Sequence, residues 1–195
     1  MMEETPPCSV RKEEELRPLS RMKGPVLICL ALVAVVAVWL YWFLAFHGFS
    51  AREKPSVVEE FFATHARRIA TPKGAKELRN PLRADPLTIA EARDHFADHC
   101  AVCHANNGNG ETAINRGLYP PAPDLRSART QSLADGEIFY IIKNGVRFTG
   151  MPGWGGEDEE NWQLVLFIRH LPRITAKELA LMKEVNGLEP EGDHR

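Results

Sequence analysis

Two cysteines and one histidine are the residues best suited to chemistry, and they stand together in HCAVCHANNGNG, residues 99–110. Cys100 and Cys103 are separated by two residues, and His104 follows at once. A cysteine pair with this spacing can form a redox disulfide, supply half of a zinc site, or attach a c-type haem. The rest of the sequence must decide among these three kinds of site.

The zinc and disulfide interpretations lack the residues and the setting that they require. A structural zinc site needs four ligands, typically from two such pairs, and the only other cysteines, Cys8 and Cys29, precede or begin a long apolar segment. A thioredoxin-like disulfide needs a βαβ setting, whereas this region predicts only helices and loops. The C-x-x-C-H pattern is the attachment signature of haem c. We therefore predict one covalent haem per chain, with Cys100 and Cys103 bonded to its vinyl groups and His104 bound to the iron.

Met151, in the stretch TGMPGW, is the best candidate for the second axial ligand. It lies in a Gly- and Pro-containing turn between two predicted helices. A methionine on a helix face more often fills a core, which is what we expect of Met182. Methionine opposite histidine raises the reduction potential of haem iron and closes it to small ligands. The competing histidines fall on helices with charged neighbours, where we expect exposed side chains: His65, His95, His99 and His170.

Trp154, three residues after Met151, is a candidate for a hydrogen bond from its indole N–H to a haem propionate. Arg116, Arg126 and Arg147 could neutralise the propionates. We favour solvated surface positions for these three arginines, because arginine is mostly exposed in proteins.

Residues 86–172 resemble a class I c-type cytochrome domain, the monohaem kind also found in subunits of respiratory oxidases. Four motifs carry the resemblance: CAVCH (100–104), PDL (123–125), GMP (150–152) and NWQLVLFIRHL (161–171). The resemblance implies a small all-α bundle around one haem. It also implies that the Pro123 carbonyl holds His104 and that Leu125 packs on the haem.

In the family, the first and last helices cross through a small residue and an aromatic residue. Here Ala92 takes the place where glycine is usual, with Phe96 beside it and Phe167 on the last helix. The replacement of glycine by alanine bears only on how closely the two helices approach.

The segment from Gly24 to Phe46 is apolar and carries no charge. It is longer than the apolar part of a cleaved signal peptide, ~7–15 residues, and reaches the ~20 residues that span a bilayer. Five basic residues precede it, whereas Arg52 and Lys54 are the only ones close behind it. The positive-inside bias therefore predicts an uncleaved anchor in the cell inner membrane, with the N-terminus cytoplasmic and the haem domain periplasmic.

These features predict an all-α chain, because no strand-like alternation is visible. Its expected parts are a disordered cytoplasmic tail (1–23), a transmembrane anchor (24–46), an amphipathic helix and an extended linker (47–85), a cytochrome c domain (86–172), and a C-terminal helix and tail (173–195). Capping boxes predict helix starts at Ser56 with Glu59, Thr88 with Glu91, and Thr175 with Glu178.

The predicted function is single-electron transfer between a redox donor and a redox acceptor at the membrane surface, without enzymatic chemistry. The partners are then respiratory proteins and the lipid bilayer. The near balance of 24 basic and 26 acidic residues shows no broad basic footprint for nucleic acid. Two alternatives remain open: a haem c subunit of a larger oxidase or dehydrogenase complex, and an open catalytic or gas-sensing haem to which Met151 does not bind.

Overall fold

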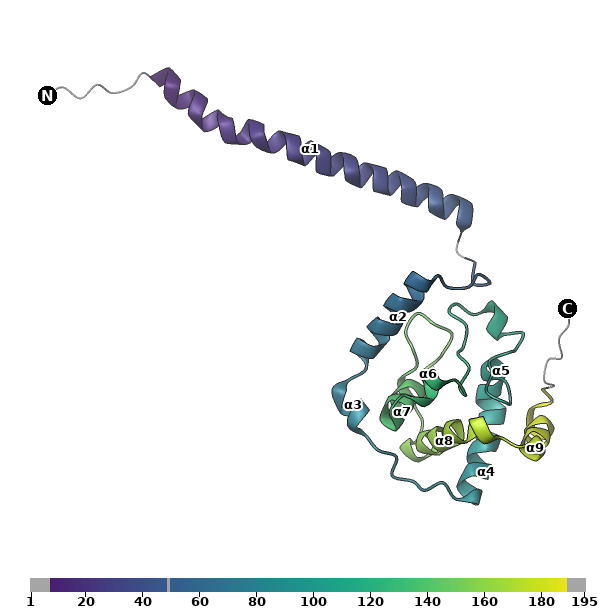
Figure 1. Ribbon diagram of the computed structural model, residues 1–195. Helices are drawn as coiled ribbons and strands as arrows, with labels where there is room; N and C mark the ends of the chain where they lie inside the picture. Colours follow the sequence, from purple (N-terminus) through teal and green to yellow (C-terminus); the bar gives the residue numbers. More distant parts are fainter. Residues whose placement is uncertain (1–7, 49, 189–195) are drawn as a thin grey trace. The chain divides into compact units, whose positions relative to one another are not determined.

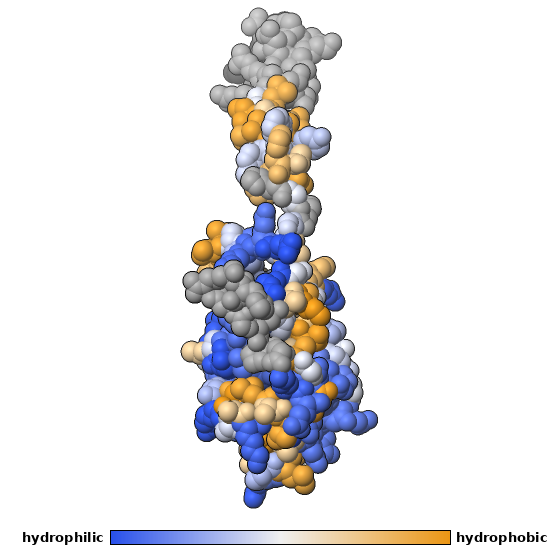
Figure 2. Space-filling view, turned by 90° about the vertical axis from the view of Figure 1, so that its right-hand side faces the viewer, coloured by the Kyte–Doolittle hydropathy of each residue, from blue (hydrophilic) through white to orange (hydrophobic). Residues whose placement is uncertain are grey.

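A single long helix, α1 (Cys8–His47), forms the N-terminal part of the chain (Figure 1). The computed structural model describes residues 8–48 and 50–188. Within α1, Gly24–Phe46 is a segment of 23 residues that is long and apolar enough to cross a membrane, and none of it is buried in the protein. Hydrophobic residues cover much of the surface of this helix in Figure 2.

Helix α1 begins at Cys8, upstream of the apolar segment. The expectation of a disordered tail over residues 1–23 is therefore wrong from residue 8 onward, and residues 1–7 lie outside the described part. Residues 12–17 have the sequence KEEELR, in which every residue is a strong helix former. Local propensity thus favours a helix over residues 12–17, and α1 runs on from there through Pro18 into the apolar segment.

The chain divides after residue 50, and residues 51–195 form a second compact unit. The described part of this unit contains helices and loops but no β-strand, as predicted. Its elements are α2 (Val57–Ala70), α3 (Lys73–Glu77), α4 (Pro86–His95), the π-helical turn η1 (Phe96–Cys100), α5 (Ala101–His104), the 3-10 turn η2 (Asn115–Gly117), α6 (Ala128–Gln131), α7 (Asp135–Asn144), α8 (Asp158–His170), the 3-10 turn η3 (Leu171–Arg173) and α9 (Ala176–Asn186).

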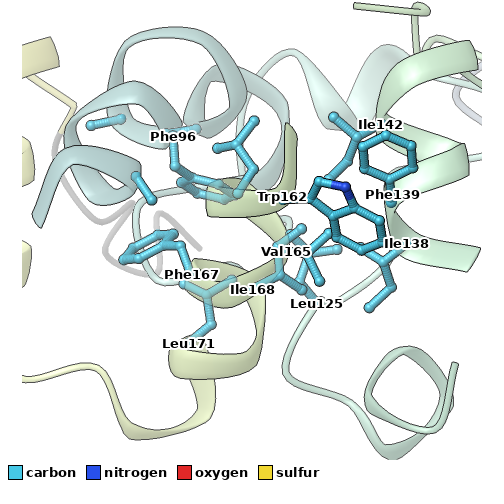
Figure 3. Close-up of a cluster of buried hydrophobic side chains, with 14 of the residues drawn as sticks. Phe96, Leu125, Ile138, Phe139, Ile142, Trp162, Val165, Phe167, Ile168 and Leu171 are labelled. Atoms are coloured by element: carbon cyan, nitrogen blue, oxygen red, sulfur yellow. The ribbon is translucent and has the colours of Figure 1, made fainter. Parts of the chain in front are cut away.

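The core of this unit lies where α4 and η1 cross α8 (Figure 3). Ala92 and Phe167 are completely buried, and Phe96 is only 1% exposed. The rings of Phe96 and Phe167 lie 5.1 Å apart at 53°, a tilted arrangement that aromatic pairs favour. The crossing expected from the resemblance is therefore present, with alanine in the place where glycine is usual.

A second aromatic pair joins α7 to α8. Trp162 and Phe139 stack with ring centroids 4.1 Å apart, and both side chains are buried (Figure 3). Trp162 is thus a core residue of the cytochrome c domain.

Helix α4 begins one turn earlier than its sequence suggests. Asp85 is the N-cap, and its Oδ1 accepts hydrogen bonds from the backbone N–H groups of Leu87 and Thr88 at 3.0 and 3.1 Å. Pro86 occupies the first helical position, where its missing N–H costs nothing. The predicted start at Thr88 is therefore wrong, because Asp85 and Pro86 together form the stronger start signal.

Residues 71–86 do not form the extended linker that their three prolines suggest. They include helix α3, whose Ala75 is buried against α7. A side chain at Gly136 of α7 would place its Cβ 1.9 Å from the Ala75 carbonyl oxygen, so the two backbones touch. Asn80 then donates a hydrogen bond of 2.9 Å to the Trp162 carbonyl. This segment therefore fastens α2 to the rest of the unit.

Candidate cofactor site

A cavity of about 490 Å³ opens in the second unit. Its volume lies within the ~300–1,000 Å³ of ordinary cofactor and ligand sites, and apolar side chains dominate its wall. The expected cofactor contacts that line it are Cys100, His104, Pro123, Leu125, Met151 and Trp154. Residues distant in sequence are thus brought together around one space.

The C-x-x-C-H segment approaches this cavity from the end of a helix. Cys100 closes the π-helical turn η1, and His104 is the last residue of α5. Residues three and four apart on a helix lie on the same face, so Cys100, Cys103 and His104 lie near one another. Cys103 is half-buried and is not one of the residues that line the cavity.

Both thiols resist ionisation. Burial, with a smaller contribution from Cys103, raises the pKa of Cys100 to about 12. Burial also raises the pKa of Cys103. Reactive disulfide-exchange cysteines have a lowered pKa, so this environment does not favour a thioredoxin-like role.

The His104 ring is held in an apolar environment beside Phe96, with ring centroids 6.5 Å apart. Burial lowers the pKa of His104, and the Pro123 carbonyl partly opposes this effect. The contact with Pro123 does not reach hydrogen-bond geometry, because the buried Nδ1 atom has no hydrogen-bond partner in the described structure. A neutral imidazole is the form that binds a metal. Binding through Nε2 would leave the Nδ1 proton to be donated toward Pro123.

The loop that carries Met151 is fastened to the C-terminal end of α7. The Val146 N–H donates to the Met151 carbonyl at 3.1 Å, and the Met151 N–H donates to the Thr149 hydroxyl at 3.1 Å. The backbone N–H of Trp154 donates to the Ile142 carbonyl of α7 at 3.1 Å. These bonds fix the backbone on both sides of the methionine.

Gly145, the C-cap of α7, makes this close approach possible. Its φ is +69°, in the region that favours glycine. A Cβ at this position would lie 2.5 Å from the Gly153 backbone nitrogen and 2.7 Å from the Met151 carbonyl oxygen. The shape of the Met151 loop therefore depends on a glycine that the sequence already marks as a helix end.

Trp154 lies at the edge of the cavity. Its ring meets the His99 ring of η1 edge to face, with centroids 5.6 Å apart. The contact links the Met151 loop to the turn that ends at Cys100, so two predicted ligand segments are joined through this pair.

Helix α2 contributes a wall of the cavity that the sequence motifs do not reveal. Glu59, Glu60, Thr64 and Arg67 line it, and Arg129 of α6 hydrogen-bonds to both Glu60 and Thr64. The amphipathic pattern predicts helix α2, but periodicity alone does not say which of its faces packs against the domain.

Arg67 and Arg129 are the arginines on the cavity wall. Arg116, Arg126 and Arg147 do not line it, and Arg126 instead pairs with Asp124 at 2.9 Å. Burial lowers the pKa of Arg67, the neighbouring Arg129 adds to this effect, and Glu137 opposes it.

The donor set and the cavity fit haem c better than zinc. Among residues 8–48 and 50–188, no three His, Cys, Asp or Glu side chains gather into a metal-binding cluster. The cavity instead presents the His104 imidazole, whose Nδ1 has no hydrogen-bond partner, and the Met151 thioether on a separate loop, between apolar walls. Histidine with methionine is an established pair of axial ligands for haem iron.

Comparison with known families agrees with this site. Residues 87–168 match the family model described as cytochrome c oxidase, cbb3-type, subunit III. No curated protein gives a significant match to the chain. The matched segment contains the C-x-x-C-H motif, Pro123 and Met151, and it leaves out α1 to α3 and α9. Proteins with this domain are typically electron carriers with covalently attached haem c. Residues 87–168 are therefore a cytochrome c domain of the cbb3 oxidase subunit III family.

Proposed function

We propose that the protein is a membrane-anchored monohaem cytochrome c that transfers single electrons between redox partners. The observation that carries the proposal is the cavity of about 490 Å³ whose wall includes Cys100, His104 and Met151. These residues come from two segments that line the same cavity, and backbone hydrogen bonds fix the Met151 loop.

Each residue of this set has a distinct role in the proposal. The Cys100 and Cys103 thiols would add across two vinyl groups; each would form an S–C bond, and its proton would go to the adjacent carbon. His104 and Met151 would bind the iron, and the Pro123 carbonyl would accept a hydrogen bond from the Nδ1–H of His104. Leu125 packs on the cofactor face, and Trp154 offers its indole N–H to a propionate. Bound haem c supplies the reversible one-electron change of its iron.

Arg67 and Arg129 are the proposed counter-charges of the propionates. Vinyl and propionate groups occupy opposite edges of the haem ring, and α2 and α5 lie on opposite sides of this unit (Figure 1). In the described part of the chain, the Arg67 side chain forms no hydrogen bond or close ion pair, although it is half-buried on the cavity wall. A half-buried guanidinium that has no anionic partner can bind a carboxylate such as a haem propionate.

The apolar segment of α1 is proposed to keep this domain at the inner membrane. The excess of lysine and arginine before the segment supports a cytoplasmic N-terminus and a periplasmic cytochrome domain. An anchor raises the effective concentration of the domain at its membrane partners. The respiratory donor and acceptor would then meet the haem at the membrane surface.

Permanent membership of an oxidase complex is a second candidate role, and the family match supports it. Purification from native membranes in mild detergent separates the two possibilities. A fixed subunit co-purifies in constant ratio with other haem proteins, whereas a mobile carrier elutes alone.

The proposal is tested by the intact mass of the chain produced with a c-type haem attachment system. We expect the mass of the polypeptide plus one haem, and its retention after denaturation. The variant with both Cys100→Ser and Cys103→Ser should lose the covalent haem, whereas Cys29→Ser should keep it. A full-length chain of unmodified mass from a host that loads other cytochromes c would refute the proposal.

A further inference from the structure

Helix α2 packs against its own domain with its polar side. Glu59, Glu60, Thr64 and Arg67 face the cavity. Its large apolar side chains are instead 56–85% exposed: Val57, Val58, Phe61, Phe62 and Ile69. An amphipathic helix on a globular domain normally buries its apolar stripe, so this helix presents the opposite arrangement.

The polar contacts of α2 hold it in this orientation. Arg129 binds Glu60 and Thr64, and the Lys76 ammonium donates to the Arg68 carbonyl at 2.7 Å. The contact of α3 with Gly136 fixes the segment that follows. If α2 turned to bury its apolar side chains, Glu60 and Thr64 would lose their contacts with Arg129. The exposed apolar side chains of α2 can therefore be buried only by a surface outside the domain.

The position of α2 in the chain points to the membrane surface as that cover. Ten residues, 47–56, separate the apolar segment of α1 from the first residue of α2. Even fully extended, ten residues reach only about 35 Å. A chain anchored by α1 therefore keeps α2 close to the headgroup region of the bilayer, whatever the path of the connection.

The charges of α2 suit such a surface. Its two acidic residues lie on the cavity side, where Glu60 pairs with Arg129 and Glu59 closes the capping box with Ser56. Arg68 and His65 lie among the apolar residues of the outward face, at helical spacing from Phe61. Apolar and aromatic residues beside basic ones, without acids, are typical of helices that lie in the interface of anionic membranes.

We propose that α2 lies along the membrane surface, with Val57, Val58, Phe61, Phe62 and Ile69 inserted among the lipids. The proposal rests on the membrane anchor of the proposed function. Because the other face of α2 is a wall of the cavity, this contact would hold the haem domain at one height and orientation above the bilayer. Redox partners would then reach the cofactor from the sides of the domain that α2 does not cover.

Spin-label accessibility in the full-length protein tests this placement. Cys8 and Cys29 are changed to serine, and Cys100 and Cys103 are already bonded to the haem, so one new cysteine can be labelled. Labels at Val58→Cys and Ile69→Cys probe the outward face of α2. A label at Lys177→Cys, an exposed position of α9, serves as the control for a side chain in water. The haem-loaded protein is placed in nanodiscs of phosphatidylethanolamine and phosphatidylglycerol.

We expect the ratio of oxygen to nickel-chelate accessibility at positions 58 and 69 to exceed that at position 177 several-fold. Equal ratios at all three positions would mean that the stripe is in water and would overturn the proposal. Low accessibility to both reagents would mean a protein contact and would also overturn it. The optical spectrum reports haem attachment, and the recovery of protein in the nanodiscs reports anchoring by α1. Failure of the proposed function can therefore be distinguished from failure of the membrane contact of α2.

Discussion

Among single residues, Cys100 and His104 line the cavity in surroundings that disfavour their charged forms. Burial raises the pKa of the Cys100 thiol and lowers the pKa of the His104 imidazole. Met151 is fixed through its own backbone N–H and carbonyl. These are conditions for binding a prosthetic group, and they differ from those of a site that performs acid–base or thiol catalysis.

Met151→Leu should open the sixth position of the iron while leaving the fold intact, because leucine matches methionine in volume but offers no sulfur. We expect a lower reduction potential and carbon monoxide binding by the reduced protein. Potentiometric titration and optical spectra measure both. Met182→Leu is the control, because Met182 is fully buried in α9 away from the cavity. Equal spectra for the two variants would contradict Met151 ligation.

Arg67→Gln should lower the reduction potential, because loss of a positive charge near the cofactor favours the oxidised iron. A charge at intermediate distance in a partly solvated site changes the potential by on the order of tens of millivolts. Arg68→Gln removes the same charge from an exposed neighbouring position and should leave the potential nearly unchanged. If both variants change the potential equally, Arg67 is not a specific counter-charge.

At the scale of elements, helix ends and short connections position the site. The capping boxes at Ser56 and Thr175 are present as predicted, because a short local motif determines each of them. The packing of α3 on α7 was not predictable, since it depends on Gly136 and Ala75, which are distant in sequence. The same limit applies to α2, whose periodicity predicts a helix but not which side faces the cavity.

Gly145→Ala should displace the Met151 loop. Alanine at φ +69° is strained by roughly 1–2 kcal/mol, and its Cβ would meet the Gly153 nitrogen at 2.5 Å. We expect a lower free energy of unfolding and loss of the far-red absorption of methionine-ligated ferric haem. Gly117→Ala is the matched control, because a Cβ there meets no atom within 4 Å. A Gly145→Ala protein with unchanged stability and spectrum would show that the close contact of Gly145 with the backbone of Gly153 does not position Met151.

Glu178→Gln should weaken the attachment of α9 to the end of α8. Burial favours the neutral form of Glu178, but hydrogen bonds from Thr175 and from His170 prevail and hold its pKa below the ordinary value of 4.5. The stabilisation is therefore present above that value and is lost as pH falls through the lower pKa of the folded state. We expect a loss of about 1 kcal/mol in the free energy of unfolding at neutral pH.

Chemical denaturation between pH 3 and 7 measures this effect. The difference between Glu178→Gln and the parent protein should shrink toward the acid end. Glu184→Gln, an exposed position on the same helix, provides the comparison and should follow the parent protein. A difference that is constant with pH would contradict a role for the ionised carboxylate.

At the scale of the whole molecule, two units combine an apolar helix with a cytochrome c domain. The face of the second unit seen in Figure 2 is largely hydrophilic, with separate apolar patches. The motifs around Cys100, Pro123 and Met151 predicted the domain and the part of the cavity wall that they themselves form, because their spacing is typical of haem c attachment and ligation. They did not predict the parts of the wall that α2, α6 and α7 contribute. The arginines on the wall were not predicted, since Arg67 lies outside those motifs.

The optical spectrum of the purified, reduced protein, before and after addition of carbon monoxide, distinguishes a haem iron closed on both sides from an open one. A c-type haem spectrum that carbon monoxide leaves unchanged is the predicted result, because His104 and Met151 then close both axial positions. A spectrum that shifts would contradict this account and favour an open catalytic or gas-sensing haem. Absence of any haem spectrum, in protein from a host that attaches haem c, would contradict the assignment of Cys100 and Cys103 as attachment residues.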